Sequence, residues 1–184
     1  MTTGTTLSLK DFPRTNETTL GMLYDQLRVI HEVCSVKQIK YWVIGETLLG
    51  QVRHGTIIPW NDNNDVGIRG EDKEKLLPIL NDVARQNNMV IKDSVHGLKV
   101  SMKDSKGIGT DIFFYHKESV SDNFLNGRWV LHSDRSRKNW PKDWFLDTEL
   151  DSIIVAPIGP TNVCVPGNPL RYLHTLYGSD CMCF

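Results

Sequence analysis

The sequence predicts an α+β fold in which a small mixed sheet is covered by packed helices. Helical periodicity appears near both ends of the chain, and short apolar runs rich in β-branched and aromatic residues lie between. The two kinds of element follow no regular alternation, which argues against a doubly wound parallel sheet. A length of 184 residues suffices for one hydrophobic core. We therefore predict a flexible lead-in over residues 1–14 and a single domain over residues 15–184.

Composition narrows the class of protein. Hydrophobic residues make up 40% and charged residues 23% of the chain, as in ordinary globular domains. A net charge of −1 argues against a nucleic-acid binder with a broad basic surface, so we expect no nucleic-acid partner. No apolar run is long enough for a membrane span, and the Thr-rich start lacks the features of a signal peptide. We therefore expect a cytoplasmic protein, whose four cysteines fit no common zinc spacing and are reduced thiols.

Apolar spacing predicts the first helix from Glu17 to Lys37, with Thr15 or Asn16 as its N-cap. Its apolar stripe consists of Leu20, Leu23, Leu27, Ile30 and Cys34. The elements expected next are a buried strand over residues 41–44, a short helix over 47–52, a strand over 66–68 and a helix over 71–86.

In the second half of the sequence, the pattern of residues predicts mainly strands. We expect them over residues 89–92, 98–102 and 111–115, with further strands over 126–130 and 152–156. Proline and glycine punctuate residues 157–169, which we predict to be a loop. Asn168 then caps a last helix with Pro169 at its first position.

Three polar features fall at the ends of predicted strands. The cluster of residues 61–65 opens one strand, Asp111 opens another, and the turn from Gly45 to Thr47 leads from a strand into a helix. Carboxylates on adjacent strands can hold Mg²⁺ between them, and a strand-to-helix turn suits a phosphate. Each feature alone also has an ordinary explanation as a solvated turn or a strand end. Their combination favours a phosphoryl-transfer site.

Residues 45–67 read GETLLGQVRHGTIIPWNDNNDVG. This segment resembles the signature of the LicD family, which includes the fukutin and fukutin-related proteins. The matching residues are, in order, Thr47, Leu48, Leu49, Gly50, Arg53, Ile58, Pro59, Trp60, Asp62 and Asp65. Thr110–Phe113 resembles a later Asp-Ile-Phe strand of the family, and residues 139–149 and 165–178 resemble its downstream segments. The resemblance covers roughly residues 20 to 178.

This resemblance implies a nucleotidyltransferase fold, similar to the catalytic palm of polymerase β. It implies the transfer of a phosphorylated small molecule, such as phosphocholine or ribitol phosphate, from a CDP-activated donor to a sugar hydroxyl of a glycan. By the same resemblance, Mg²⁺ or Mn²⁺ would be held by Asp65 and Asp111, completed by Asn63 or Asp62, and one of the carboxylates would accept the proton of the acceptor hydroxyl. The donor phosphates would be bound by Gly45, Thr47 and Arg53.

The chain departs from the family pattern at two positions. Glu46 stands where the family usually has a second glycine, and Asn63 stands where it has the first aspartate of its Asp-x-Asp pair. Asp62 would face the other side of an extended strand unless the backbone there is irregular. The alternatives to the transferase are therefore a non-catalytic donor-binding module and a true nucleotidyltransferase. Arg53 has an alternative as well, a structural ion pair.

Overall fold

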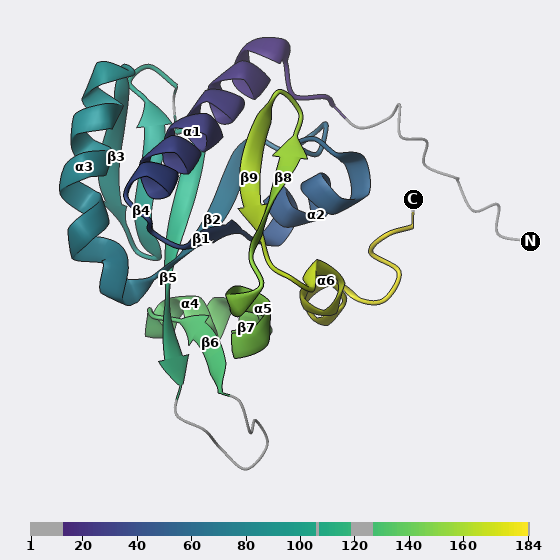
Figure 1. Ribbon diagram of the computed structural model, residues 1–184. Coiled ribbons are helices and arrows are strands. Elements are labelled where there is room, and N and C mark those ends of the chain that lie inside the picture. The colour runs from purple at the N-terminus through teal and green to yellow at the C-terminus, as the bar shows by residue number, and fades with distance from the viewer. Residues whose placement is uncertain (1–12, 106, 119–126, 184) are drawn as a thin grey trace, which may run out of the picture.

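The computed structural model describes residues 13–105, 107–118 and 127–183 (Figure 1). The predicted lead-in over residues 1–14 lies outside the described residues, except for residues 13 and 14. The helices are α1 (Glu17–Val36), α2 (Gly45–His54), α3 (Lys73–Gln86), α4 (Asp134–Asn139), α5 (Asp147–Asp151) and α6 (Pro169–Tyr177), with a 3-10 turn η2 (Gly70–Asp72). The strands are β1 (Tyr41–Val43), β2 (Asn63–Arg69), β3 (Met89–Ser94), β4 (Gly97–Met102), β5 (Gly109–Glu118), β6 (Arg128–Leu131), β7 (Trp144–Leu146), β8 (Ile154–Ile158) and β9 (Thr161–Val165).

The main sheet is mixed, which confirms the predicted α+β class. Its central order is β1-β2-β5-β4-β3, and β6 and β7 extend it from the far end of β5. Strands β2 and β5 run parallel, and every other strand pair among the described residues is antiparallel. Figure 1 shows α1 lying across the sheet with α3 beside it, while α4, β6, β7 and α5 gather around the lower end of β5.

Helix α1 forms where the apolar stripe predicted it. The side chain of Asn16 accepts a hydrogen bond from the Thr19 N–H at 2.8 Å and so satisfies one free donor of the first turn. Leu23, Leu27 and Ile30 are at most 1% exposed, so the stripe faces the core. Truncating one such leucine to alanine typically costs about 2–5 kcal/mol, which makes α1 a major source of stability.

The predicted loop over residues 157–169 was wrong, because Thr161–Val165 forms β9 in a hairpin with β8. Gly159, at φ +52°, and Pro160 make the two-residue turn of that hairpin. Val163 and Val165 alternate inward along β9 and are at most 3% exposed. The proline and glycine therefore mark a tight turn between two strands rather than an extended loop.

Other elements differ from the expectation in their limits or were not predicted. Helix α4, strand β7 and helix α5 occupy a segment for which we predicted no structure. Strand β2 begins at Asn63, so the end of the polar cluster lies within the strand. No helix among the described residues combines the length and the apolar character needed to cross a bilayer. All four cysteines are free thiols, and Cys34 and Cys181 are buried.

Candidate active site

The parallel pairing of β2 with β5 places Asp65 directly opposite Asp111. Both side chains line one cavity of about 270 Å³, together with Asn63 and Gly45. The structure thus brings together four of the residues that the sequence singled out, from two neighbouring strands and from the start of α2. The wall of the cavity contains the two carboxylates that were predicted to share a metal ion.

The backbone of Asp65 is held from both sides. Its N–H donates to Thr47 Oγ1 at 2.8 Å, and its carbonyl oxygen accepts the Ile44 N–H at 3.1 Å. Thr47 is 2% exposed and is not among the residues that line the cavity. The sequence predicted that Thr47 binds donor phosphate, whereas the structure places its hydroxyl against β2. In this position Thr47 holds the backbone of Asp65 in β2 against the first turn of α2.

Gly45 opens α2 beside Asp65 in a conformation that favours glycine. Its φ is +54°, and a Cβ built on it would lie 3.4 Å from Asp65 Oδ2 and 3.6 Å from the Tyr177 hydroxyl. The Gly45 N–H donates to the Tyr172 hydroxyl at 3.2 Å. A side chain here would combine backbone strain with crowding of the carboxylate. The glycine therefore lets the start of α2 approach the site closely.

The carboxylates carry more negative charge than neighbouring cations offset. Burial raises the pKa of Asp65 to about 8, and the charges of Asp111, Glu46 and Asp143 contribute in the same direction. Lys99 lowers it somewhat, and its Nζ lies 3.3 Å from Asp111 Oδ2 in a partly exposed ion pair. A divalent cation between the two aspartates would relieve this excess.

The donor atoms available suit a hard cation. Mg²⁺ is commonly bound through one or two carboxylates with waters and substrate phosphates as the other ligands. Asp65 and Asp111 supply the carboxylates, and Asn63 lies beside them with its Nδ2 3.2 Å from Asp65 Oδ1. No cluster of three or more His, Cys, Asp or Glu side chains arranged for a metal occurs within the described part of the chain. The residues present therefore fit a magnesium site completed by phosphate oxygens.

Asp62 and Arg53 lie away from this cavity. Asp62 is exposed, and its N–H donates to Asn61 Oδ1 at 3.2 Å. Arg53 lies in the last turn of α2, where its Nη1 donates to the carbonyl oxygen of Cys181 at 2.9 Å. Neither side chain is among those that line the cavity around Asp65. Their predicted roles in metal and phosphate binding stay predictions, and the hydrogen bond from Arg53 ties the C-terminal segment to α2.

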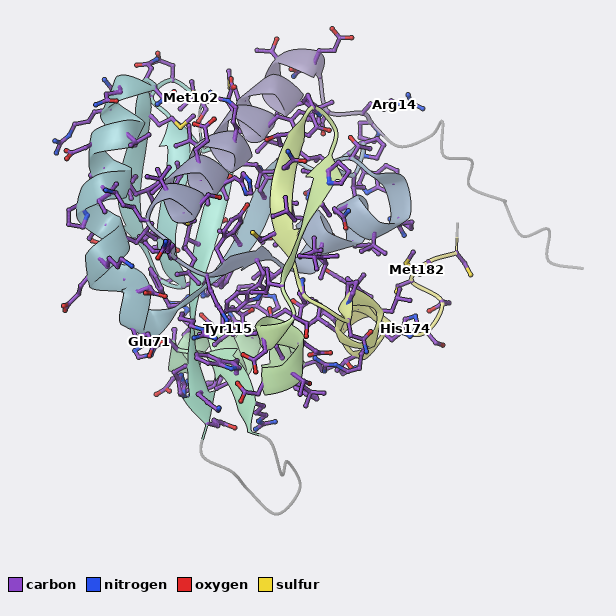
Figure 2. The ribbon with its side chains drawn as sticks, viewed as in Figure 1. Arg14, Glu71, Met102, Tyr115, His174 and Met182 are labelled. Carbon is purple, nitrogen blue, oxygen red and sulfur yellow. The ribbon has the colours of Figure 1, made fainter. Side chains whose placement is uncertain are left out.

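Asp143 is a site residue that the sequence analysis did not identify. It is 9% exposed, lines the same cavity, and accepts hydrogen bonds at Oδ1 from the hydroxyls of Tyr115 at 2.7 Å and Tyr172 at 3.1 Å. Burial raises its pKa to about 6, while the two hydroxyls act in the opposite direction. Tyr115 is buried, and Figure 2 shows it in the lower part of the molecule, where β5 pairs with β6. The centroid of its ring lies 5.7 Å from that of Phe145 in β7. The available signal was an aspartate set among the aromatic residues of the segment NWPKDWF, residues 139–145.

An aromatic wall completes the cavity. The ring centroids of His96 and Trp140 lie 4.6 Å apart, and those of Phe113 and Trp140 lie 5.5 Å apart, both in edge-to-face arrangements. Trp140 remains 37% exposed although it lines the cavity. The site therefore combines a charged part around Asp65 with an apolar part that can contact a base or a sugar ring.

Comparison with known proteins finds one matching family model and several relatives. The family model described as LicD/FKTN/FKRP, nucleotidyltransferase domain, matches residues 38–168, which include every predicted site residue. Uncharacterized protein RP689 of Rickettsia prowazekii is 30% identical over 155 residues, 84% of this chain and 53% of that protein. The human ribitol 5-phosphate transferase FKRP is 26% identical over 166 residues, 86% of this chain and 32% of that protein. The chain thus spans about half, or less, of the length of these relatives.

The solved structures that align with this chain include an antibiotic-resistance factor and an antibiotic adenylyltransferase. The solution structure of the antibiotic-resistance factor ANT(2'')-Ia aligns with a TM-score of 0.45 at 12% identity, covering 88% of this chain and 84% of that one. The lincosamide antibiotic adenylyltransferase LnuA aligns with a TM-score of 0.43 at 9% identity, covering 92% and 98% of the two chains. The predicted nucleotidyltransferase fold is confirmed by the match to the family model, which is described as a nucleotidyltransferase domain and covers residues 38–168.

Proposed function

Because the chain belongs to the LicD/FKTN/FKRP nucleotidyltransferase-domain family, we propose that it transfers a phosphorylated small molecule to a glycan. The group would be phosphocholine-like or polyol-phosphate-like, the donor CDP-activated, and the acceptor a sugar hydroxyl. The transfer would depend on Mg²⁺ or Mn²⁺. The observation that carries the proposal is the pairing of Asp65 with Asp111 across parallel strands at one cavity.

The residues around the cavity suggest a division of roles. Asp65 and Asp111 would hold the metal, with the side-chain oxygen of Asn63 as a further ligand. The metal would neutralise charge on the phosphates of the donor during transfer. Gly45 and the first turn of α2 offer a helix N-terminus at the cavity wall, where phosphate oxygens are favoured. A carboxylate of the site would take the proton from the acceptor hydroxyl.

The products distinguish this reaction from nucleotidyl transfer. If the acceptor oxygen attacks the phosphorus that carries the small molecule, a new phosphodiester forms. The bond from that phosphorus to the oxygen bridging the two phosphates breaks, and CMP leaves with the bridging oxygen. If it attacks the other phosphorus, CMP becomes attached to the acceptor and the phosphorylated small molecule leaves. Mass spectrometry of the acceptor and of the released species therefore separates the two enzyme functions.

A donor-binding module without chemistry is the second candidate, and the observation that favours it is Asn63. The experiment is a thermal-shift screen of nucleotides and CDP-linked donors, with and without Mg²⁺ or Mn²⁺, followed by product analysis of every hit. A metal-dependent shift of several degrees identifies the donor class. CMP release with transfer supports the proposed reaction, and binding without turnover supports the module. If no nucleotide or donor raises the melting temperature of wild type more than it raises that of the Asp65→Asn variant, the proposed function is wrong.

A further inference from the structure

Three buried polar side chains, linked by hydrogen bonds, lie between α1 and the strands that carry Asp65 and Asp111. Asn64, Thr110 and Gln26 are each 0% exposed. Asn64 Nδ2 donates to the carbonyl oxygen of Leu23 at 3.0 Å and to Thr110 Oγ1 at 3.2 Å, and Thr110 Oγ1 donates to Gln26 Oε1 at 2.9 Å. The Leu23 carbonyl can only accept, so it fixes the orientation of the Asn64 amide and hence the direction of the whole chain.

This hydrogen-bond chain joins α1 to the two central strands at the positions next to the carboxylates. Asn64 directly precedes Asp65, Thr110 directly precedes Asp111, and Asn64 and Thr110 are themselves partners in the parallel register. Side chains alternate along a strand, so these two face α1 while the aspartates face the cavity. Figure 1 shows α1 running across β2 and β5 on that side.

The apolar residues of these strands do not define the register by themselves. After Asp111, β5 continues with Ile112–Tyr115, and β2 continues from Asp65 with Val66–Ile68, so many side chains there are interchangeable in a core. If β5 slipped by one residue on β2, Asp111 would turn toward α1, and a slip by two would leave Asn64 and Thr110 buried without each other. Buried polar groups without partners are strongly disfavoured, so the Asn64–Thr110 pair penalises both errors.

We propose that the Gln26–Thr110–Asn64 chain is a positioning device that sets the register of β2 on β5 and thereby the spacing of Asp65 and Asp111. For catalysis the proposal rests on the proposed function, because the spacing matters only if the two aspartates share a cation. The three residues are positioning residues, since none of them lines the cavity. Gln26 Nε2 and Asn64 Oδ1 are buried without a hydrogen-bond partner in the described structure, so Thr110 Oγ1 is the hydrogen-bonding contact that links these two side chains.

The test compares two substitutions of one side chain. Thr110→Val keeps the shape and removes the hydroxyl, whereas Thr110→Ser keeps the hydroxyl. Mn²⁺ binding to the full chain is measured by calorimetry. We expect Thr110→Val to weaken it about tenfold, as changes behind metal ligands often do. Thr110→Ser should stay within about twofold of wild type. Gln26→Met, which removes the acceptor at the other end of the chain, replaces Thr110→Val if that variant does not fold.

A matched control is Ser105→Ala, which removes another buried hydroxyl, one that shares its proton between the carbonyl oxygens of Met102 at 3.0 Å and Ile108 at 2.8 Å. It should lower stability and leave Mn²⁺ affinity unchanged. If Thr110→Val behaves like this control in both measurements, the polar chain is merely structural and the proposal is overturned.

Amide hydrogen exchange provides a second readout that needs no metal. In Thr110→Val, exchange over residues 63–66 and 109–112 should accelerate about tenfold more than exchange in β3. Uniform acceleration over the sheet would refute the role in register. If wild type binds no Mn²⁺, either alone or with a CDP-linked donor, but the local acceleration appears, the proposed function fails while the role of these residues in register stands.

Discussion

Replacing Asp65 by asparagine should stabilise the metal-free protein at neutral and alkaline pH. The burial of this carboxyl raises its pKa to about 8 from a reference of 3.8. Between these two values the folded state holds a proton that the unfolded state has released. Stability is therefore highest below the reference pKa, falls as the pH rises, and has lost the full contribution above the folded pKa. Asp65→Asn removes this dependence while keeping the shape of the side chain.

Linkage limits the size of the effect. One proton changes the unfolding free energy by at most about 1.4 kcal/mol per pH unit. Asp65 borders an open cavity, so solvent screening reduces this value. We expect wild type to lose about 1–3 kcal/mol more than Asp65→Asn between about pH 5 and about pH 8. Asp143, whose pKa is shifted in the same direction, contributes to the pH profile of both proteins, so the quantity to compare is the difference between the two profiles.

The assay is urea unfolding in the presence of a chelator, repeated across the pH range for both proteins. The same proteins are then heated with Mn²⁺ and a CDP-linked donor at neutral pH. Only wild type should gain thermal stability, because a ligand that binds the folded state alone stabilises that state. Parallel pH profiles in the metal-free proteins would refute the reasoning, since they would mean that Asp65 is ionised without cost.

The remaining predictions concern the other site residues. Gly45→Ala should lower the free energy of unfolding in urea by about 1–2 kcal/mol because of the positive φ, and it should weaken donor binding by crowding Asp65. Donor binding equal to wild type would show that this turn does not contribute to the site. Arg53→Ala should expose the segment around Cys181 to limited proteolysis, and a donor affinity equal to wild type in the folded variant would exclude its phosphate contact. Asn63→Asp should strengthen Mn²⁺ binding without nucleotide by roughly 1–3 kcal/mol in a titration at alkaline pH, and equal affinities would show that position 63 is not a ligand.

The sequence predicted those parts of the fold that depend on local pattern. Helix α1 follows from a stripe of five apolar residues, and α6 follows from Asn168 and Pro169 at its start. Helices α4 and α5 are six and five residues long, too short for periodicity to reveal them. Hairpin β8–β9 was missed because a proline and a glycine at a two-residue turn look the same in sequence as those of a loop.

The candidate site residues could be predicted only where they belong to the family-like motif or stand at the start of a predicted strand. Asp65 and Asp111 could be named from their positions, and the parallel register then set them side by side. The separation of Arg53 from the cavity could not be predicted, because it depends on where the C-terminal segment returns to α2. Asp143 depends on contacts with Tyr115 and Tyr172, which are distant in sequence. Such convergence is a property of the tertiary structure and leaves little trace in local pattern.

The charge balance of the site gives Asn63 a consistent physical role. Its amide donates to Asp65 Oδ1, where an aspartate would instead add a negative charge beside two carboxylates. The metal-free site therefore costs less stability with asparagine than it would with the family's usual aspartate. The same change removes an anionic metal ligand, so the phosphates of a donor must supply more of the coordination. Metal and donor should then bind with positive coupling, each raising the affinity for the other by the same factor.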